Sequence, residues 1–149
     1  MKKIIIVLSF ILLTSCGYQP IFSSKNSNFL IEDIIHDTND RISLKIKNNL
    51  RYLSKAENYT RIIKLNLKSE KKINISSKDS KGDPSVYKMT ISTNLEIYSN
   101  NELIKKRNIS KNFSYKNTKN KFNLKQYEKN IENNLIETIK DDIILILYN

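Results

Sequence analysis

The sequence predicts an α+β fold: a two-layer sandwich with two helices packed on one face of a mainly antiparallel four-stranded sheet. Three observations support this prediction. Apolar and polar residues alternate over several stretches between Tyr59 and Tyr115, which is the period of half-buried strands. Apolar residues recur at helical spacing in two further stretches, one before and one after this region. A short apolar run near the front supplies another strand, so the expected order is β-α-β-β-β-α.

The first strand and helix come from residues 29 to about 55. Phe29 to Ile35 is apolar-rich and suits a strand. Turn and cap residues follow, and a helix is expected to begin near Asn39 or Asp40. Basic residues lie off the apolar stripe of this helix, as on a solvated helix face. The stripe consists of Ile42, Ile46, Leu50 and Leu53.

Two strands are expected next. Apolar residues occupy alternate positions at Ile63, Leu65 and Leu67. Ile73 and Ile75 continue the same alternation, which predicts a long strand. A loop is expected from Ser76 to Ser85, because Asp, Gly and Pro gather there. The following strand has the clearest alternation of the chain. Its apolar face consists of Tyr87, Met89, Ile91, Thr93, Leu95 and Ile97.

The last strand and the last helix complete the domain. Ser99-Asn100-Asn101-Glu102 predicts a tight hairpin, and the returning strand runs from about Leu103 to Tyr115. A two-residue turn would place Ile104 opposite Ile97, but Ile109 and the later apolar residues have the other parity. A β-bulge between Ile104 and Ile109 would reconcile the two. A long amphipathic helix is expected from about Asn123. Its stripe is Leu124, Tyr127, Ile131, Leu135, Ile139, Ile143 and Ile146.

The first sixteen residues have the pattern of an export signal. Lys2 and Lys3 precede an apolar run of about ten residues, half of what a membrane-spanning helix needs. Leu13-Thr14-Ser15-Cys16 resembles a bacterial lipobox, in which a diacylglycerol is joined to the cysteine sulfur and cleavage leaves that cysteine first. An ordinary signal peptide with a chance cysteine is the alternative. We predict a signal peptide at residues 1–15, a lipidated tether at 16–28 and a single domain at 29–149.

Composition narrows the class of function. The chain of 149 residues carries a formal net charge of +11, which would suggest nucleic acid for a cytoplasmic protein, but the export signal disfavours that partner. Its one His and one Cys exclude a multi-histidine metal site and an internal disulfide. There is no serine elbow and no glycine-rich phosphate loop. We therefore expect a binding protein without catalytic residues, metal or cofactor other than the lipid on Cys16.

A family resemblance begins at Cys16-Gly17-Tyr18-Gln19-Pro20, with the apolar pair Ile21-Phe22 after it. This start resembles the lipopolysaccharide-assembly lipoproteins of the LptE family, especially alphaproteobacterial forms. The segment from Asp40 to Leu50 is similar to that family's Arg-x-x-x-x-x-x-Asn-x-Leu segment, and the element order agrees. The final helix departs from the family, with Asn, Lys and Ile where typical members use Ala and Gln.

The resemblance implies a location and partners. It implies an outer-membrane lipoprotein on the periplasmic face, the plug and partner of a β-barrel translocon of the LptD type that inserts lipopolysaccharide. Lipopolysaccharide carries phosphates and acidic sugars, which Lys and Arg complement. Charge and placement alone, with no family motif, select the candidate contacts. They are Lys64, Lys68, Lys71, Lys72, Lys105, Lys106 and Arg107.

Two alternatives stay open at this point. The candidate cations could serve only to keep a strand edge from pairing, or reflect AT-rich coding. The chain could also be an unrelated small outer-membrane lipoprotein that acts as a structural or peptidoglycan-facing adaptor.

Overall fold

The computed structural model describes residues 28–55 and 58–148. Within them the order is strand β1 (Phe29–His36), helix α2 (Arg41–Leu50), the 3-10 helix η2 (Arg51–Lys55), strands β2 (Arg61–Lys78), β3 (Pro84–Ser99) and β4 (Glu102–Lys116), and helix α3 (Lys121–Tyr148). The predicted signal peptide, the predicted lipidation of Cys16 and all of the tether except Asn28 lie outside the described residues.

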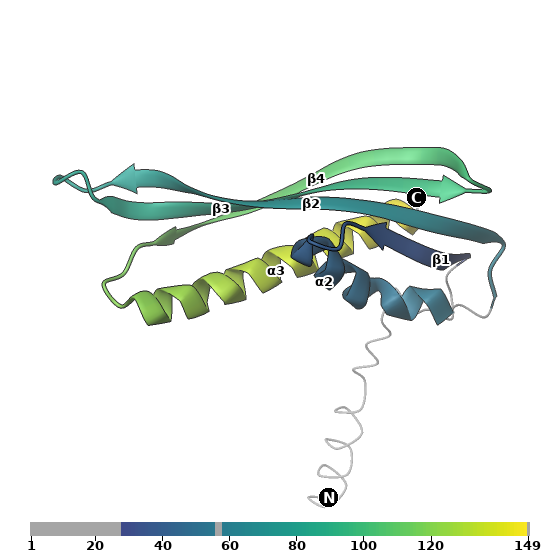
Figure 1. Cartoon of the computed structure of the whole chain (residues 1–149), viewed down its shortest axis with the longest axis horizontal. Helices are drawn as coiled ribbons and strands as arrows, with labels where there is room; N and C mark the ends of the chain where they lie inside the picture. Colours follow the sequence, from purple (N-terminus) through teal and green to yellow (C-terminus); the bar gives the residue numbers. More distant parts are fainter. Residues whose placement is uncertain (1–27, 56–57, 149) are drawn as a thin grey trace, which may run out of the picture.

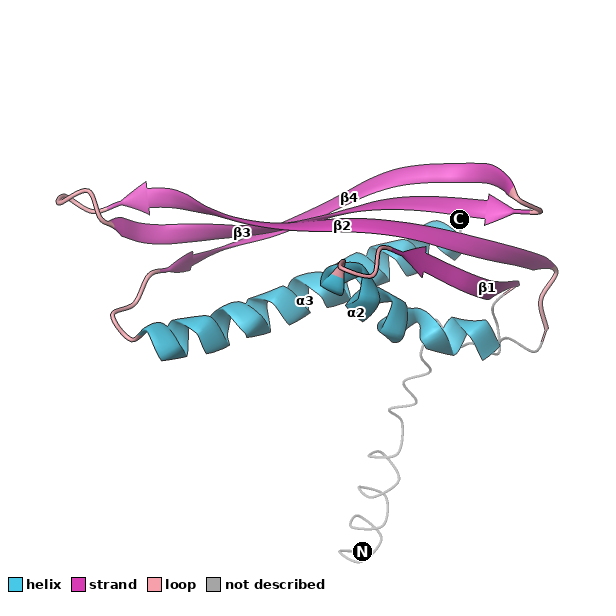
Figure 2. Ribbon diagram, viewed as in Figure 1, coloured by secondary structure: helices cyan, strands magenta, loops and turns pink. Residues whose placement is uncertain are grey.

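The two-layer α+β prediction is confirmed. The four strands form one sheet in the order β1-β2-β3-β4, with β1 parallel to β2 and the other neighbours antiparallel. Both α-helices lie on the same side of this sheet (Figure 1). The long β2, β3 and β4 twist together across the top of the molecule, whereas β1 covers only one end (Figure 2). A one-sided sheet of this kind buries its apolar face and leaves the other face wet.

The core lies between the sheet and the helices. Strand residues of one parity supply it, as alternation requires: Ile63, Leu65 and Leu67 are at most 1% exposed. Helix α2 contributes Ile42, Ile46 and Leu50. From α3 the buried residues are Leu124, Ile131, Leu135, Ile136, Ile139, Ile143, Ile144 and Leu147. None of the helices in residues 28–55 and 58–148 combines the length and the hydropathy of a membrane-spanning segment.

Helix α2 begins where the sequence predicted. Asp40 is its N-cap, and its Oδ1 accepts the backbone N–H of Ser43 at 2.9 Å. Oδ2 of the same carboxylate accepts the Ser43 hydroxyl at 2.6 Å and the backbone N–H of Ser69 at 2.7 Å. The Ser69 hydroxyl then bonds to that of Thr93 at 2.9 Å. One capping residue thus starts α2 and also fastens it to β2 and β3.

The β3–β4 hairpin is tight, as predicted, because Asn100 and Asn101 take φ values of 51° and 64°. Positive φ at both central residues is the requirement of a type I′ turn, and Asn tolerates it. The bulge was predicted between Ile104 and Ile109, but the register shifts between Ile97 and Tyr98, which face Lys105 and Leu103. Ile104 is therefore the extra residue, and Lys105 rather than Ile104 stands opposite Ile97.

Two further boundaries differ from the prediction. The β2–β3 loop occupies only residues 79–83, because β2 continues through Ser76 to Lys78 and β3 starts at Pro84. Asp79 closes this short loop by accepting the N–H groups of Lys81 and Asp83. Helix α3 starts at Lys121 rather than Asn123, because the Asn120 side chain caps it by accepting the Asn123 N–H at 3.0 Å.

Candidate functional site

The predicted lipopolysaccharide contacts lie on both faces of the sheet. Lys64, Lys68 and Lys72 of β2 have the parity opposite to the buried residues, so they project from the outer face. Lys106 joins them on β4, where it pairs with Glu96. Lys71, Lys105 and Arg107 have the other parity and lie on the helix side. The adjacent residues Lys105, Lys106 and Arg107 therefore do not act as one patch.

Three of the outer-face lysines, Lys64, Lys72 and Lys106, have carboxylate partners. Lys64 lies 3.5 Å from Glu32, and Lys72 lies 3.0 Å from Glu70. Such exposed pairs contribute little to stability and exchange readily with other anions. Lys68 has no ion pair among the residues that the structure describes.

Lys68 and Lys106 share a shallow hollow on this outer face. Its volume is about 340 Å³, and Asn66, Asn94 and Glu96 complete its lining. Glu96 accepts Lys106 Nζ at 2.7 Å and the Asn66 amide at 3.1 Å. The hydrogen bond from Lys106, followed by those from Asn66 and Tyr98, holds the pKa of Glu96 below its usual value. Lys68 can bind an oxyanion here, and Lys106 and the Asn66 amide can join it once both exchange Glu96 for that oxyanion.

Lys71 connects the two layers instead of facing solvent. Its Nζ lies 2.6 Å from Glu132 of α3, and Lys45 of α2 binds the other oxygen of the same carboxylate at 2.5 Å. Burial alone would raise the pKa of Glu132, whose side chain is only 14% exposed, but the hydrogen bonds from Lys45 and Lys71 lower it. The three residues form one charged contact between α2, β2 and α3.

Lys105 caps the end of helix α3. Its Nζ donates to the carbonyl of Ile146 at 3.3 Å, and Arg61 donates to the carbonyl of Leu147 at 3.4 Å. Cations are favoured at this end of a helix, because its last carbonyls are unpaired and carry the negative end of the dipole. Arg107 donates to the carbonyl of its neighbour Lys106 at 2.9 Å.

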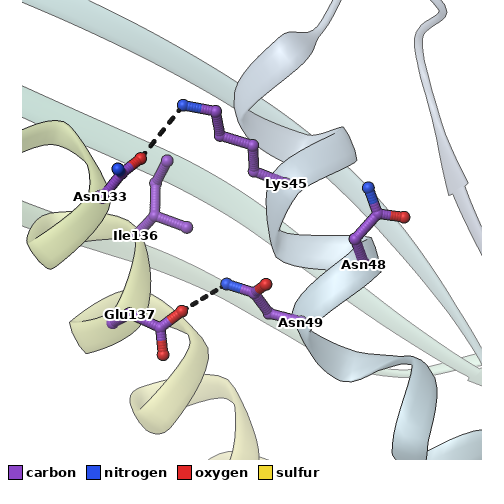
Figure 3. Close-up of a pocket in the computed structure, with 6 residues that line it drawn as sticks. All are labelled: Lys45, Asn48, Asn49, Asn133, Ile136 and Glu137. Atoms are coloured by element: carbon purple, nitrogen blue, oxygen red, sulfur yellow. Dashed lines mark hydrogen bonds between the residues drawn. The ribbon is translucent and has the colours of Figure 1, made fainter. Parts of the chain in front are cut away.

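A groove between the two helices has a volume of about 390 Å³. Figure 3 shows Lys45 and Asn49 reaching from α2 to Asn133 and Glu137 of α3 across it. Its polar groups therefore bridge the helices, and we assign it a structural role. Within residues 28–55 and 58–148, no cluster of three His, Cys, Asp or Glu residues could hold a metal ion.

Sequence reasoning missed Arg61, Glu96 and Glu132, because each depends on a partner from another element. Parity could have found Arg61: it precedes Ile63 by two residues and so shares the helix-side face. Nothing in the sequence pairs Glu132 with Lys71, which lies 61 residues earlier.

Comparison with known proteins gives the fold a context. No family model matches the sequence, and no curated protein matches it. Solved structures do match. A minor lipoprotein of Acinetobacter baumannii superposes with a TM-score of 0.61 at 11% identity, covering 87% of this chain and 93% of that one. An uncharacterized lipoprotein B of Nitrosomonas europaea gives 0.63 at 11% identity, covering 85% and 86%.

A third match is the rare lipoprotein B of Shewanella oneidensis, with a TM-score of 0.53 at 12% identity over 76% of this chain and 90% of that one. At these identities the likeness concerns the fold. The described domain thus has a fold that small bacterial lipoproteins share along nearly their whole length.

Proposed function

We propose that the chain is a lipid-anchored outer-membrane lipoprotein, the accessory or plug subunit of a β-barrel translocon that assembles lipopolysaccharide. The observation that carries the proposal is the joint occurrence of a lipobox at Cys16 and a domain with the fold of bacterial lipoproteins. The Cys16-Gly17-Tyr18-Gln19-Pro20 start, which resembles the LptE family, supplies the specific role. The protein acts by binding and not by covalent chemistry.

Affinity purification tests the partner. The native lipoprotein, tagged at its C-terminus and extracted in mild detergent, should recover an outer-membrane β-barrel identifiable by mass spectrometry. Recovery of peptidoglycan-associated proteins without any barrel would favour the adaptor alternative and contradict the translocon role.

The anchor is tested by Cys16→Ser. Only a thiol can form the thioether with diacylglycerol, so this variant should leave the membrane fraction after cell lysis. Membrane retention of the variant would contradict lipidation at this residue.

The two sheet faces allow a sharper test of lipopolysaccharide contact. Lys68 and Lys106 share the outer-face hollow, whereas Lys105 caps α3 and Lys71 binds Glu132. We propose that the outer-face hollow contacts the phosphates. Replacing Lys68 and Lys106 with Ser should weaken lipopolysaccharide binding about tenfold, since exposed ion pairs each contribute under about 1 kcal/mol.

A matched control is available on the same face. Lys88 and Lys116 are also exposed on the outer face, away from the hollow, and their replacement with Ser removes the same charge. Binding is measured by surface plasmon resonance on immobilised lipopolysaccharide at two salt concentrations. An equal loss for both double variants would mean that net charge, not the hollow, governs binding.

A further inference from the structure

The end of the domain where the described chain begins is built from four elements. The carbonyl of Asn28 accepts both the N–H and the hydroxyl of Thr60, each at 3.0 Å. The Ser99 hydroxyl donates to the carbonyl of Ile62 at 3.1 Å, which joins the β3–β4 hairpin to the start of β2. Arg61 reaches the C-terminus of α3. We call this region the anchor-side end; in Figure 1 it lies at the right, opposite the β2–β3 loop.

Large apolar side chains are exposed at the anchor-side end. Leu103 is 51% exposed and Ile104 is 48% exposed, and both lie beside the tight hairpin turn. The β-bulge explains their position, since the extra residue Ile104 falls out of the ladder. Ile62 and Tyr59, at the start of β2, are exposed by 44% and 43%. Single exposed residues of this kind are ordinary, but these four all lie at the same end of the sheet, to either side of β3, and an apolar partner is favoured there.

Cations flank these apolar side chains. Arg61 and Lys105 line a cavity of about 420 Å³ whose apolar wall includes Ile63, Ile97 and Ile104. Both cations donate to carbonyl oxygens, and no carboxylate in the described part of the chain pairs with either. Each keeps further N–H donors for an anion. Apolar side chains ringed by Lys and Arg are the pattern of surfaces that rest at the boundary between headgroups and acyl chains.

The length of the chain before the domain points to the same partner. Cys16 precedes Asn28 by twelve residues, which at full extension reach at most about 43 Å. The 18 residues of β2 extend about 60 Å at the usual rise of a strand. An anchor on Cys16 therefore holds Asn28, at the anchor-side end, within about 43 Å of the bilayer, whereas the β2–β3 loop can lie beyond that reach. Residues 79–83 of this loop include no large apolar side chain.

We infer that the anchor-side end docks directly on the phospholipid surface that carries the lipid anchor. Leu103 and Ile104 enter the interface, and Arg61 and Lys105 contact lipid phosphates. The far half of the β2–β3 hairpin then points away from that surface. This inference rests on the lipid anchor of the proposed function but not on a barrel partner, and it describes the lipoprotein on its own.

The absence of tryptophan from the sequence makes the test direct. Leu103→Trp places a single reporter at the anchor-side end, and Lys81→Trp places a matched one in the exposed β2–β3 loop. Each mature protein, purified from membranes, is reconstituted in vesicles of phosphatidylethanolamine and phosphatidylglycerol with brominated acyl chains. We expect a blue-shifted emission and strong quenching at position 103, and solvent-like, unquenched emission at position 81.

A charge variant tests the cations separately. In the Leu103→Trp protein, Arg61→Gln with Lys105→Gln keeps amide donors for the helix carbonyls but removes both charges. The ratio of docked to undocked protein should fall roughly fivefold per charge on anionic vesicles and not on phosphatidylcholine vesicles. Lys78→Gln with Lys81→Gln is the control of equal charge and should change nothing. Circular dichroism melting confirms that each variant is folded.

The outcomes separate the two proposals. If the mature protein does not float with vesicles, the lipid anchor itself is wrong. If it floats but the reporter at position 103 is unquenched, or is quenched no more than the one at position 81, the docking inference is wrong while the anchor stands. Quenching at position 103 that is insensitive to the Arg61 and Lys105 replacements would remove the cations from the docking surface.

Discussion

The sheet has two halves that share one alternation but differ in what covers them. On β2, Leu65 and Leu67 lie under α2 and are at most 1% exposed, whereas Ile73 and Ile75 have the same parity and are 41% and 50% exposed. The change comes at Ser69, because α2 begins at Asp40, whose carboxylate accepts the Ser69 N–H. Beyond Lys71, which binds Glu132 of α3, that helix still packs on β3 and β4, but Ile73 and Ile75 of β2 are left exposed.

This difference shows that parity and burial are separate properties. Alternation chooses the face of the sheet, and the length and start of the neighbouring helix choose how much of that face is covered. In the covered half, buried apolar side chains pack between the sheet and the helices. In the far half, the N-terminal turns of α3 contact β4: Tyr115 donates to Glu128 at 2.6 Å and stacks edge-on against Tyr127. Burial, with the hydrogen bond to Glu128, raises the pKa of Tyr115.

The two halves should differ most in how far the free energy of unfolding falls when an apolar side chain on the same face of β2 is truncated. Leu65→Ala removes a fully buried side chain and should lower the free energy of unfolding by about 2–5 kcal/mol. Ile75→Ala, on the same face of the same strand, should change it by less than about 0.5 kcal/mol. Urea unfolding followed by circular dichroism measures both. Similar losses for the two variants would mean that the far half is covered in solution.

The boundary between the halves should be the next most sensitive place. Asp40→Ala removes the cap of α2 and leaves the Ser69 N–H without its acceptor, so we expect a loss of about 2 kcal/mol. Asp37→Ala removes an exposed carboxylate in the same turn and serves as control. Hydrogen exchange should show the Ser69 amide losing protection in the first variant alone; unchanged protection would argue against the boundary role.

Glu132 links the layers across this boundary, and its contribution should depend on pH. Because Lys45 and Lys71 lower its pKa in the folded protein, its stabilising effect is present above the ordinary value of 4.5. That effect is lost as the pH falls through the lower folded pKa. Glu132→Gln should cost about 1 kcal/mol at neutral pH, the two lysines being partly exposed, and should flatten the acid side of the stability profile.

A control for Glu132 lies on the same helix. Asp141 is 65% exposed and pairs with Lys140, so Asp141→Asn should leave the profile nearly unchanged. If Asp141→Asn flattens the acid limb as much as Glu132→Gln, the effect comes from net charge and not from the contact between layers.

The smallest effect is expected on the outer face. Lys106→Ala removes the main hydrogen bond that lowers the pKa of Glu96, so that pKa should rise toward its ordinary value. The folded structure should otherwise be unchanged, since the Lys106 side chain is 64% exposed. Carboxyl NMR titration measures the shift. An unmoved pKa would show that Asn66 and Tyr98 alone hold the carboxylate ionised.

The sequence by itself determined the order of elements, the buried faces of β2 and β3, and the start of α2 at Asn39 or Asp40. These depend on neighbours within a few residues: alternation, helical spacing and an Asp three residues before Ser43. It also placed a bulge on β4, although two hydrogen-bonded strands had to form before its position at Ile104 was fixed.

Only the tertiary structure decided which predicted cations could act together. Moving the bulge by a few residues sent Lys105 to the helix side and Lys106 to the outer face, because it reverses the direction of each side chain between the predicted and the observed bulge. Glu132 found Lys45 and Lys71 through packing, across separations of 87 and 61 residues. Local patterns carry no information about such distant partners, since helix packing sets their distances. The predicted cations therefore lie in three separate places. Lys68 and Lys106 line the outer-face hollow, Lys71 joins the two layers through Glu132, and Lys105 caps α3.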